Sequence, residues 1–350
     1  MRLKKNKDDS FFHPFEIAFC GFPKSGKTTL IDKLIAKLSD ELDVGFFNTE
    51  EDKSCDLKQI DIQIKMTDMD ILFIESHHLS DFPKFVFISK DDNYDKIIDH
   101  IDKNEITEIV GVISEETLDP FDGKYPFFNR EEINKINSFI LEYFHKKIPK
   151  NIKGLILSGG KSERMEEDKG SITYHSELSQ IEYSKNLLTG ICSEVFISCR
   201  EDQKDLPHLK DHNLLFDSFP SIGPTTGILS AQFFDPTATW IVIACDLPYL
   251  DKMTVVDLLN HRNPFKNATC FLSATNKLPE PLCAIYEPKS YIKLMQYFSI
   301  NRTCPRKVLI NSNIKSLSLM NESALENVNT PQEKEMALRA IHTTGENHAN

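Results

Sequence analysis

The sequence predicts an α/β protein of two consecutive domains, in each of which apolar strands alternate with helices. Two observations carry this prediction. A length of 350 residues, 40% of them hydrophobic, is enough for two domains that each bury a core. Each half also opens with a short apolar run that ends in a glycine-containing loop. Such a run is typical of a buried strand that leads into a tight turn.

Composition restricts the partners and the compartment. The formal net charge of −12 argues against nucleic acid or an anionic membrane surface as a partner. The eight cysteines include no C-x-x-C pair, and several lie in apolar runs, as reduced thiols of cytoplasmic proteins do. Residues 1–10 are charged, and no apolar run reaches the length of a membrane span. We therefore expect a cytoplasmic protein.

The boundary between the domains is predicted from a lysine-rich segment that contains Pro149. Proline ends the preceding helix and the lysines keep the segment solvated. The expected organisation is a tail at 1–12, a first domain at 13–147, a linker at 148–152, a second domain at 153–341 and a tail at 342–350.

The first glycine loop, residues 21–28, reads GFPKSGKT and fits the P-loop pattern G-x-x-x-x-G-K-[ST]. An apolar run from Phe15 to Cys20 precedes it, and apolar residues at helical spacing follow it, so the order is strand, loop, helix. Backbone amides would cradle the phosphates of a nucleotide, Lys27 would reach the outer phosphates and Thr28 would bind Mg²⁺. The predicted nucleotide-binding residues are Gly21, Gly26, Lys27, Thr28 and Thr29.

Further apolar runs complete the first domain. Glu75 follows one of them, and two interpretations stay open: it holds Mg²⁺ through water opposite the P-loop, or it is a strand-end acid that faces solvent. His77 and His78 could suggest a metal site, but they lack other well-spaced ligands and are expected at the surface. The predicted strands are Glu16–Cys20, Ile71–Ile74, Phe85–Ile88 and Ile109–Ile113, and the predicted closing helix is Glu131–Phe144.

In the second half, strands again alternate with helical stretches, which predicts a mainly parallel sheet with helices on both faces. Ligands of such sheets bind at the carboxyl ends of the strands. The predicted strands are Gly154–Leu157, Glu194–Ser198, Leu214–Phe216, Trp240–Ala244, Thr269–Ala274 and Leu282–Tyr286.

The second glycine loop lies at the end of the first of these strands, where Ser158-Gly159-Gly160 follows Leu157. Two glycines let backbone amides approach an anion closely. Arg164 and Lys169 then place two cations within ten residues of the glycines, a device that suits a polyphosphate and its transition-state charge. The alternative is an ordinary loop between a strand and a helix with solvated charges.

Two aspartates end other strands of the second half. Asp246 follows the buried run from Trp240 to Cys245, and a carboxylate there suits Mg²⁺, which prefers carboxylate, phosphate and water oxygens. Asp217 follows Leu214–Phe216 and precedes a Gly-Pro-Thr-Thr-Gly segment at 223–227. That segment is interpreted either as a contact to a base or ribose or as a turn that begins a helix.

Residues 152–340 closely resemble the MobA-type molybdenum cofactor guanylyltransferase family, whose pattern is L-x-G-G-x-x-x-R-M-G-x-D-K. Residues 157–169 here read LSGGKSERMEEDK, and the likeness extends to Asp217, Gly223–Gly227, Cys245–Pro248, Pro281–Tyr286 and Asn327–Pro331. The resemblance implies a Rossmann-like nucleotidyltransferase domain. It also implies transfer of GMP from Mg-GTP to molybdopterin, with release of pyrophosphate.

The resemblance also implies roles for individual residues. Arg164, Lys169 and Asp246 would be catalytic, Asp246 would bind Mg²⁺, and Asn327 and Asn329 would lie near the pterin. The Gly-Gly pair resembles the guanylyl branch rather than the cytidylyl branch, although a transferase for CTP or a sugar phosphate stays an alternative. The implied GTP contacts are Leu157, Ser158, Gly159, Gly160, Lys169, Asp217 and Asp246.

Residues 14–145 resemble the MobB-type GTP-binding adaptor, a P-loop NTPase-like domain, through Gly21–Thr28, Val44-Gly45 and Met69–Glu75. The chain therefore looks like a fusion of adaptor and transferase. The resemblance implies a homodimer through the first half and molybdoenzymes as recipients of the cofactor.

Two departures from the family patterns matter. Glu166 replaces the family glycine after Arg-Met, and a carboxylate near a triphosphate is repulsive. In the first half, two family segments between the P-loop and the acidic strand are missing, which puts GTP hydrolysis there in question but not nucleotide binding. A rival interpretation follows: a GTP-binding scaffold that delivers cofactor, with a weakened transferase half.

Overall fold

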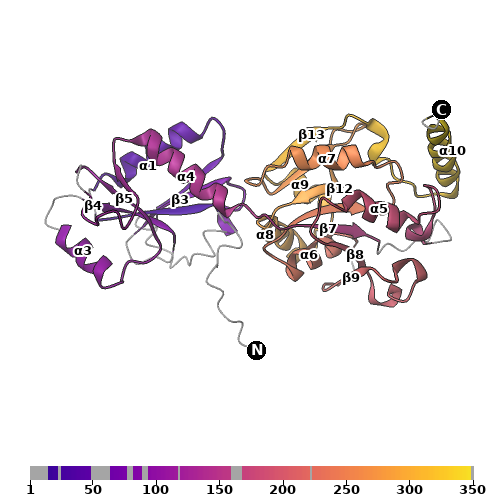
Figure 1. Ribbon diagram of the computed structural model, residues 1–350, viewed down its shortest axis with the longest axis horizontal. Helices are drawn as coiled ribbons and strands as arrows, with labels where there is room; N and C mark the ends of the chain where they lie inside the picture. The colour runs from indigo at the N-terminus through magenta and orange to yellow at the C-terminus, as the bar shows by residue number, and fades with distance from the viewer. Residues whose placement is uncertain are drawn as a thin grey trace. The chain divides into compact units, whose positions relative to one another are not determined.

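The computed structural model (Figure 1) describes residues 15–22, 25–48, 64–76, 82–88, 94–116, 119–158, 168–220 and 223–347. The chain forms two compact units, Met1–Ile148 and Pro149–Asn350. Several residues considered above lie outside the described ranges, namely the tail 1–12, His77, His78, Gly159, Gly160, Arg164 and Glu166.

A six-stranded, wholly parallel sheet forms the first unit, in the order β2-β3-β1-β4-β5-β6. All four predicted strands are present. Among the described residues, the structure adds two strands and one helix that the sequence pattern did not predict, β2, β6 and α3. The bounds are β1 Glu16–Cys20, α1 Lys27–Leu38, β2 Val44–Asn48, β3 Ile71–Ser76, β4 Lys84–Ile88, α3 Tyr94–Asp102, β5 Ile109–Ser114, β6 Phe127–Asn129 and α4 Ile133–Lys147.

Helices cover both faces of this sheet. Successive residues of a strand point to opposite faces, so a strand that is buried on both faces presents apolar side chains to the helices on each side. On one face, Phe85 of β4 lies 5.6 Å from Phe19 and 5.8 Å from Phe139 of α4, measured between ring centroids. On the other face, Val86 packs with Ile97 of α3. The central strands are therefore mostly apolar, and β1 and β4 are completely buried.

The second unit contains a seven-stranded sheet in the order β13-β11-β12-β10-β7-β8-β9. The prediction of a mainly parallel sheet is confirmed, except that β12 runs antiparallel to β10 and to β11. All six predicted strands are present, and β13 is an addition. The strands are β7 Ile152–Leu157, β8 Val195–Cys199, β9 Asn213–Phe216, β10 Thr239–Ala244, β11 Ala268–Leu272, β12 Pro279–Tyr286 and β13 Ile314–Ser318.

Helices lie on both faces of the second sheet as well (Figure 1). One apolar cluster joins the sheet to α5 and α7, through residues such as Ile181 and Val255, and a second cluster joins it to α6, α8 and α9. The helices are α5 Gln180–Leu188, α6 Pro224–Phe234, α7 Lys252–Asn260, α8 Ser290–Ser299, α9 Pro305–Ile310 and α10 Pro331–Asn347, with short 3₁₀ turns at Lys169–Ser171, Glu201–Gln203, Pro207–Leu209 and Glu322–Leu325.

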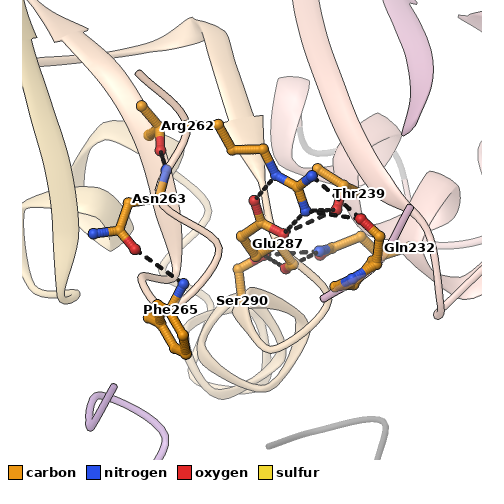
Figure 2. Close-up of polar contacts among 9 residues, drawn as sticks. Gln232, Thr239, Arg262, Asn263, Phe265, Glu287 and Ser290 are labelled. Atoms are coloured by element: carbon orange, nitrogen blue, oxygen red, sulfur yellow. Dashed lines mark hydrogen bonds and ion pairs between the residues drawn. The ribbon is translucent and has the colours of Figure 1, made fainter. Parts of the chain in front are cut away.

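A buried polar network joins the start of β10 to the end of β12 (Figure 2). Glu287, only 1% exposed, accepts two hydrogen bonds from Arg262, at 2.6 Å and 2.9 Å. Thr239 donates to the same carboxylate at 2.9 Å, and Arg262 also donates to the Pro149 carbonyl at 3.2 Å. Since β12 is antiparallel to β10, this network occupies the sheet edge opposite the carboxyl ends of β7 and β10.

None of the helices in the described part of the chain combines the length and the apolar character needed to cross a membrane.

Candidate active site

The carboxyl ends of four neighbouring parallel strands, β10, β7, β8 and β9, lie along one edge of the second sheet. The sequence-predicted residues lie there: Leu157 ends β7, Asp217 follows β9 and Asp246 follows β10. Ser158 is 5% exposed and Asp246 has a side chain 18% exposed, so both lie at the margin between the core and solvent. This is the edge at which open α/β sheets bind ligands.

Lys169 connects two of the predicted groups. It begins the 3₁₀ turn Lys169–Ser171, and its Nζ lies 3.1 Å from Oδ2 of Asp246 and 2.5 Å from Oδ1 of Asn329. An ammonium group has three N–H donors, and these contacts use two of them. The third donor has no hydrogen-bond partner among the described residues, so the described geometry is compatible with a bound triphosphate.

The segment that carries Asn329 is fixed from two sides. The backbone N–H of Val328 donates to the carbonyl of Asp246 at 3.0 Å. Glu333, in the first turn of α10, accepts from the backbone N–H of Asn329 at 2.7 Å and of Thr330 at 3.0 Å. These hydrogen bonds favour the charged carboxylate and lower the pKa of Glu333. The start of α10 therefore holds the predicted pterin-binding segment against the predicted metal ligand.

The donor set suits a hard cation that keeps most of its ligands from outside the protein. Oδ1 of Asp246 is buried and has no hydrogen-bond partner among the described residues, so it is the oxygen left for a metal. The described residues contain no cluster of three or more His, Cys, Asp or Glu side chains that could hold an ion. Mg²⁺ typically binds through one or two carboxylates plus substrate phosphates and water, and a single aspartate fits that pattern.

Cys245 does not add a nucleophile to this site. Its side chain is buried, and burial raises the pKa of the thiol to about 12. The thiol is therefore neutral at physiological pH, and a neutral thiol is a poor nucleophile.

Asp217 lies next to a residue that the sequence pattern did not single out. Ser198, in β8, donates to Oδ1 of Asp217 at 3.4 Å, and burial raises the pKa of that carboxyl group. A Cβ on Gly227 would lie only 2.5 Å from the Ser198 hydroxyl, so glycine permits this close approach. Gly223 has φ of +86° and caps α6, which confirms the interpretation that the Gly-Pro-Thr-Thr-Gly segment begins a helix.

A second group that sequence reasoning missed lies beside Asn327. A small pocket there is lined by Arg306 and Glu280, together with Leu247, Pro281, Leu282, Cys283 and Leu325. Arg306 donates to Glu280 at 2.7 Å and to the Pro279 carbonyl at 3.1 Å. An isolated arginine at the start of a short helix carries no sequence signal, and only the fold brings it next to Asn327.

The P-loop of the first unit forms the expected strand–loop–helix junction. Gly26 has φ of +83° at the start of α1, a conformation that other residues rarely adopt. Lys27 is 4% exposed, and its Nζ donates to the carbonyls of Gly21 and Phe22 at 2.9 Å and 3.0 Å. The lysine therefore lies across the loop on which the predicted nucleotide would rest.

Glu75 lies beside the P-loop and does not face solvent. It is 5% exposed, and Thr28 donates to both of its carboxylate oxygens, at 3.0 Å and 3.1 Å. The interpretation of Glu75 as a solvent-facing strand-end acid is therefore wrong, whereas its juxtaposition with Thr28 suits a shared Mg²⁺ site. Thr29, also predicted to bind nucleotide, lines a small pocket with Gly26, Leu30, Lys33, Arg130 and Glu131.

We expect Lys27→Ala to weaken nucleotide binding by the first unit. Hydrogen bonds to a charged group contribute about 3 kcal/mol at most, so the Kd of this site for GTP is expected to rise about a hundredfold. Titration with a fluorescent GTP analogue and Mg²⁺ measures this change as one weakened class of sites. Lys37→Ala, an exposed lysine on the same helix, is the matched control. Unchanged binding in Lys27→Ala would contradict the P-loop assignment.

The chain is similar in sequence to known proteins. The model of the MobA-like NTP transferase domain matches residues 154–316. A probable molybdenum cofactor guanylyltransferase from Clostridium perfringens (strain SM101 / Type A) is 30% identical over 148 residues, which cover 42% of this chain and 71% of that protein. A molybdenum cofactor biosynthesis bifunctional protein from Synechocystis is 34% identical over 180 residues, 51% of this chain and 52% of that protein. This chain thus spans about half the length of the Synechocystis relative.

A solved structure of a MobB protein homolog from Bacillus stearothermophilus is also similar, with 18% identity and a TM-score of 0.30, and the match covers 37% of this chain and 98% of that one.

The fold and the family match define the second unit as a nucleotidyltransferase domain, in which Lys169 and Asp246 lie together at the carboxyl edge of a mainly parallel sheet. The chain belongs to the MobA-like family, whose matching members are named molybdenum cofactor guanylyltransferases. The resemblance inferred for residues 152–340 is thereby confirmed, as is the enzyme class.

Proposed function

We propose that the second unit transfers GMP from Mg-GTP to molybdenum-molybdopterin and releases pyrophosphate, giving the molybdopterin guanine dinucleotide cofactor. The supporting observation is that one lysine, Lys169, contacts both Asp246 and Asn329. These three residues carry the phosphate, metal and pterin roles implied by the family. Their convergence would bring both substrates to one point on the sheet edge.

The reaction requires one bond to form and one to break. An oxygen of the terminal phosphate of molybdopterin attacks the α-phosphorus of GTP, while the bond from that phosphorus to the bridging oxygen of the β-phosphate breaks and pyrophosphate leaves. Lys169 would donate to the phosphates and offset the charge that grows on the leaving group. Asn327 and Asn329 would hold the acceptor in line. Arg164 is proposed to add a second cation.

Nucleotidyltransferases of this kind generally use a divalent metal ion, and we propose Mg²⁺ held by Asp246. When bound, Mg²⁺ would neutralise charge on the phosphates of the nucleotide. Asp246 would supply its buried Oδ1, while Oδ2 keeps its contact with Lys169. The Gly-Gly loop at 159–160 is proposed to contact the phosphates, and Asp217 and Ser158 the rest of the nucleotide.

The first unit would then bind GTP through its P-loop and act as a fused adaptor. This proposal is supported by the position of Lys27 across the loop and by the contact of Thr28 with Glu75. A cytoplasmic location, a homodimer through this unit and delivery to molybdoenzymes belong to the same proposal.

A product assay tests the proposed reaction. Purified protein is incubated with Mg²⁺, molybdate-loaded molybdopterin and each of the four nucleoside triphosphates in turn, and pyrophosphate and dinucleotide products are measured. Guanine dinucleotide from GTP alone is the expected result. Product from CTP would place the chain in the cytidylyl branch, and the absence of any product with GTP still bound would favour the scaffold function. In that case Glu166→Gly, which restores the family glycine, shows whether Glu166 is the cause.

A further inference from the structure

Next to the turn that carries Lys169 lies a histidine that the proposed reaction does not use. His208 belongs to the short 3₁₀ turn Pro207–Leu209, between β8 and β9. Its side chain is 9% exposed, and its Nε2 lies 3.3 Å from Oδ1 of Asp168, the residue immediately before Lys169. That nitrogen is excluded from solvent and makes no hydrogen bond with the described residues, so the Asp168 carboxylate is the charged group it faces.

Asp168 in turn fixes the turn that carries Lys169. The same Oδ1 accepts a hydrogen bond from the backbone N–H of Gly170 at 2.9 Å, and the Asp168 carbonyl accepts one from the Ser171 hydroxyl at 2.8 Å. Asp168 is therefore the cap of the 3₁₀ turn Lys169–Ser171. The direction in which Lys169 leaves the backbone depends on this cap.

His208 also packs directly on the turn. A Cβ on Gly170 would lie 3.2 Å from Cδ2 of His208 and 2.8 Å from Cγ1 of Ile181, so the backbone of the turn is pressed against both side chains. The histidine is itself anchored, because the adjacent Leu209 is 1% exposed and belongs to the core of the second unit. A continuous set of contacts therefore runs from the core through His208 and Asp168 to the turn that carries Lys169.

We infer that His208 is a positioning residue for Lys169: it holds the Asp168 cap so that the lysine is fixed toward Asp246 and the bound phosphates. This inference rests on the proposed function. With its N–H on Nε2, the ring would attract the Asp168 carboxylate 3.3 Å away and limit its rotation, which would keep the hydrogen bond to Gly170 formed. Positioning of this kind matters because a displacement of about 1 Å at a reacting group can cost about a hundredfold in rate.

The test compares His208→Gln with His208→Leu. Glutamine keeps an N–H donor that can reach Asp168, whereas leucine keeps apolar volume and has no donor. We expect kcat of guanylyl transfer to fall about tenfold or more in His208→Leu, with a smaller change in KM for GTP, and to recover in His208→Gln. His261→Leu, a histidine with a side chain 56% exposed at the end of α7, is the matched control. A purely structural role predicts the opposite order, because leucine fills the site at least as well.

Hydrogen exchange provides a second readout that does not need activity. The Gly170 amide is expected to lose protection in His208→Leu and to keep it in His208→Gln, since Asp168 caps it. Failure of the proposed function is recognised separately, because the wild-type chain then forms no dinucleotide while the exchange result still tests the cap. Equal kcat and equal Gly170 protection in His208→Leu and the wild type would overturn the positioning role.

Discussion

Asp246→Asn is expected to lower guanylyl transfer about a thousandfold while leaving the second unit folded. The substitution keeps the size of the side chain and one oxygen for the contact with Lys169, but it removes the negative charge that would hold Mg²⁺ at Oδ1. Stabilisation of phosphate charge by a bound metal is worth several kcal/mol. A loss of about 4 kcal/mol corresponds to a decrease of about a thousandfold in kcat/KM. Pyrophosphate release and dinucleotide formation measure the loss.

The Mg²⁺ requirement of the variant distinguishes loss of a metal ligand from a general defect of the fold. If Asp246 holds the metal, residual activity in Asp246→Asn requires a higher Mg²⁺ concentration than the wild type. Asp205→Asn, which removes the same charge from an exposed turn of the same unit, should change neither activity nor the Mg²⁺ requirement. Full activity in Asp246→Asn at the wild-type Mg²⁺ concentration would show that the metal assignment is wrong.

The strands that carry the proposed site could be predicted from the sequence because they are short apolar runs that end in polar residues. β7 and β10 are completely or almost completely buried, and such strands show nearly continuous hydrophobicity. Their parallel arrangement then places Ser158 and Asp246 at one edge. The pattern could not predict the direction of a strand. β12 is mostly buried like its neighbours, yet it runs antiparallel to them. The strands β2, β6 and β13 were missed because none is a continuous buried run, as β13 shows with several exposed positions.

The site itself was only partly predictable. The glycine loop and Asp246 have local signals. The family resemblance gave Lys169 and Asn329 separate roles, and it did not predict their contact, which joins residues 160 positions apart. Ser198 and His208 have no local signal at all. A serine within a strand and a histidine in a short turn are ordinary in sequence, and they acquire a role only because tertiary packing brings them to Asp217 and Asp168.

Arg262→Met is expected to destabilise the second unit by about 3–5 kcal/mol, because it leaves the buried Glu287 carboxylate without its ionic partner. Figure 2 shows how closely the groups surround that carboxylate: Arg262 binds it through two nitrogens, and Thr239 donates to it as well. The single tryptophan of the chain, Trp240, is fully buried in β10 next to this network. Its fluorescence during urea unfolding of the full chain therefore reports on the second unit alone.

Two further variants decide whether the charge pair is the cause. Arg262→Met combined with Glu287→Gln removes both charges, so no unpaired buried charge remains, and the double variant should be more stable than Arg262→Met alone. Arg339→Met breaks a surface pair with Glu335, where the arginine side chain is 82% exposed, and should cost about 1 kcal/mol or less. If Arg262→Met costs no more than Arg339→Met, or if the double variant is the less stable of the two, packing rather than ion pairing holds this edge of the sheet. Guanylyl transfer by the folded variant should change little, since Arg262 contacts the start of β10 and Asp246 follows its end.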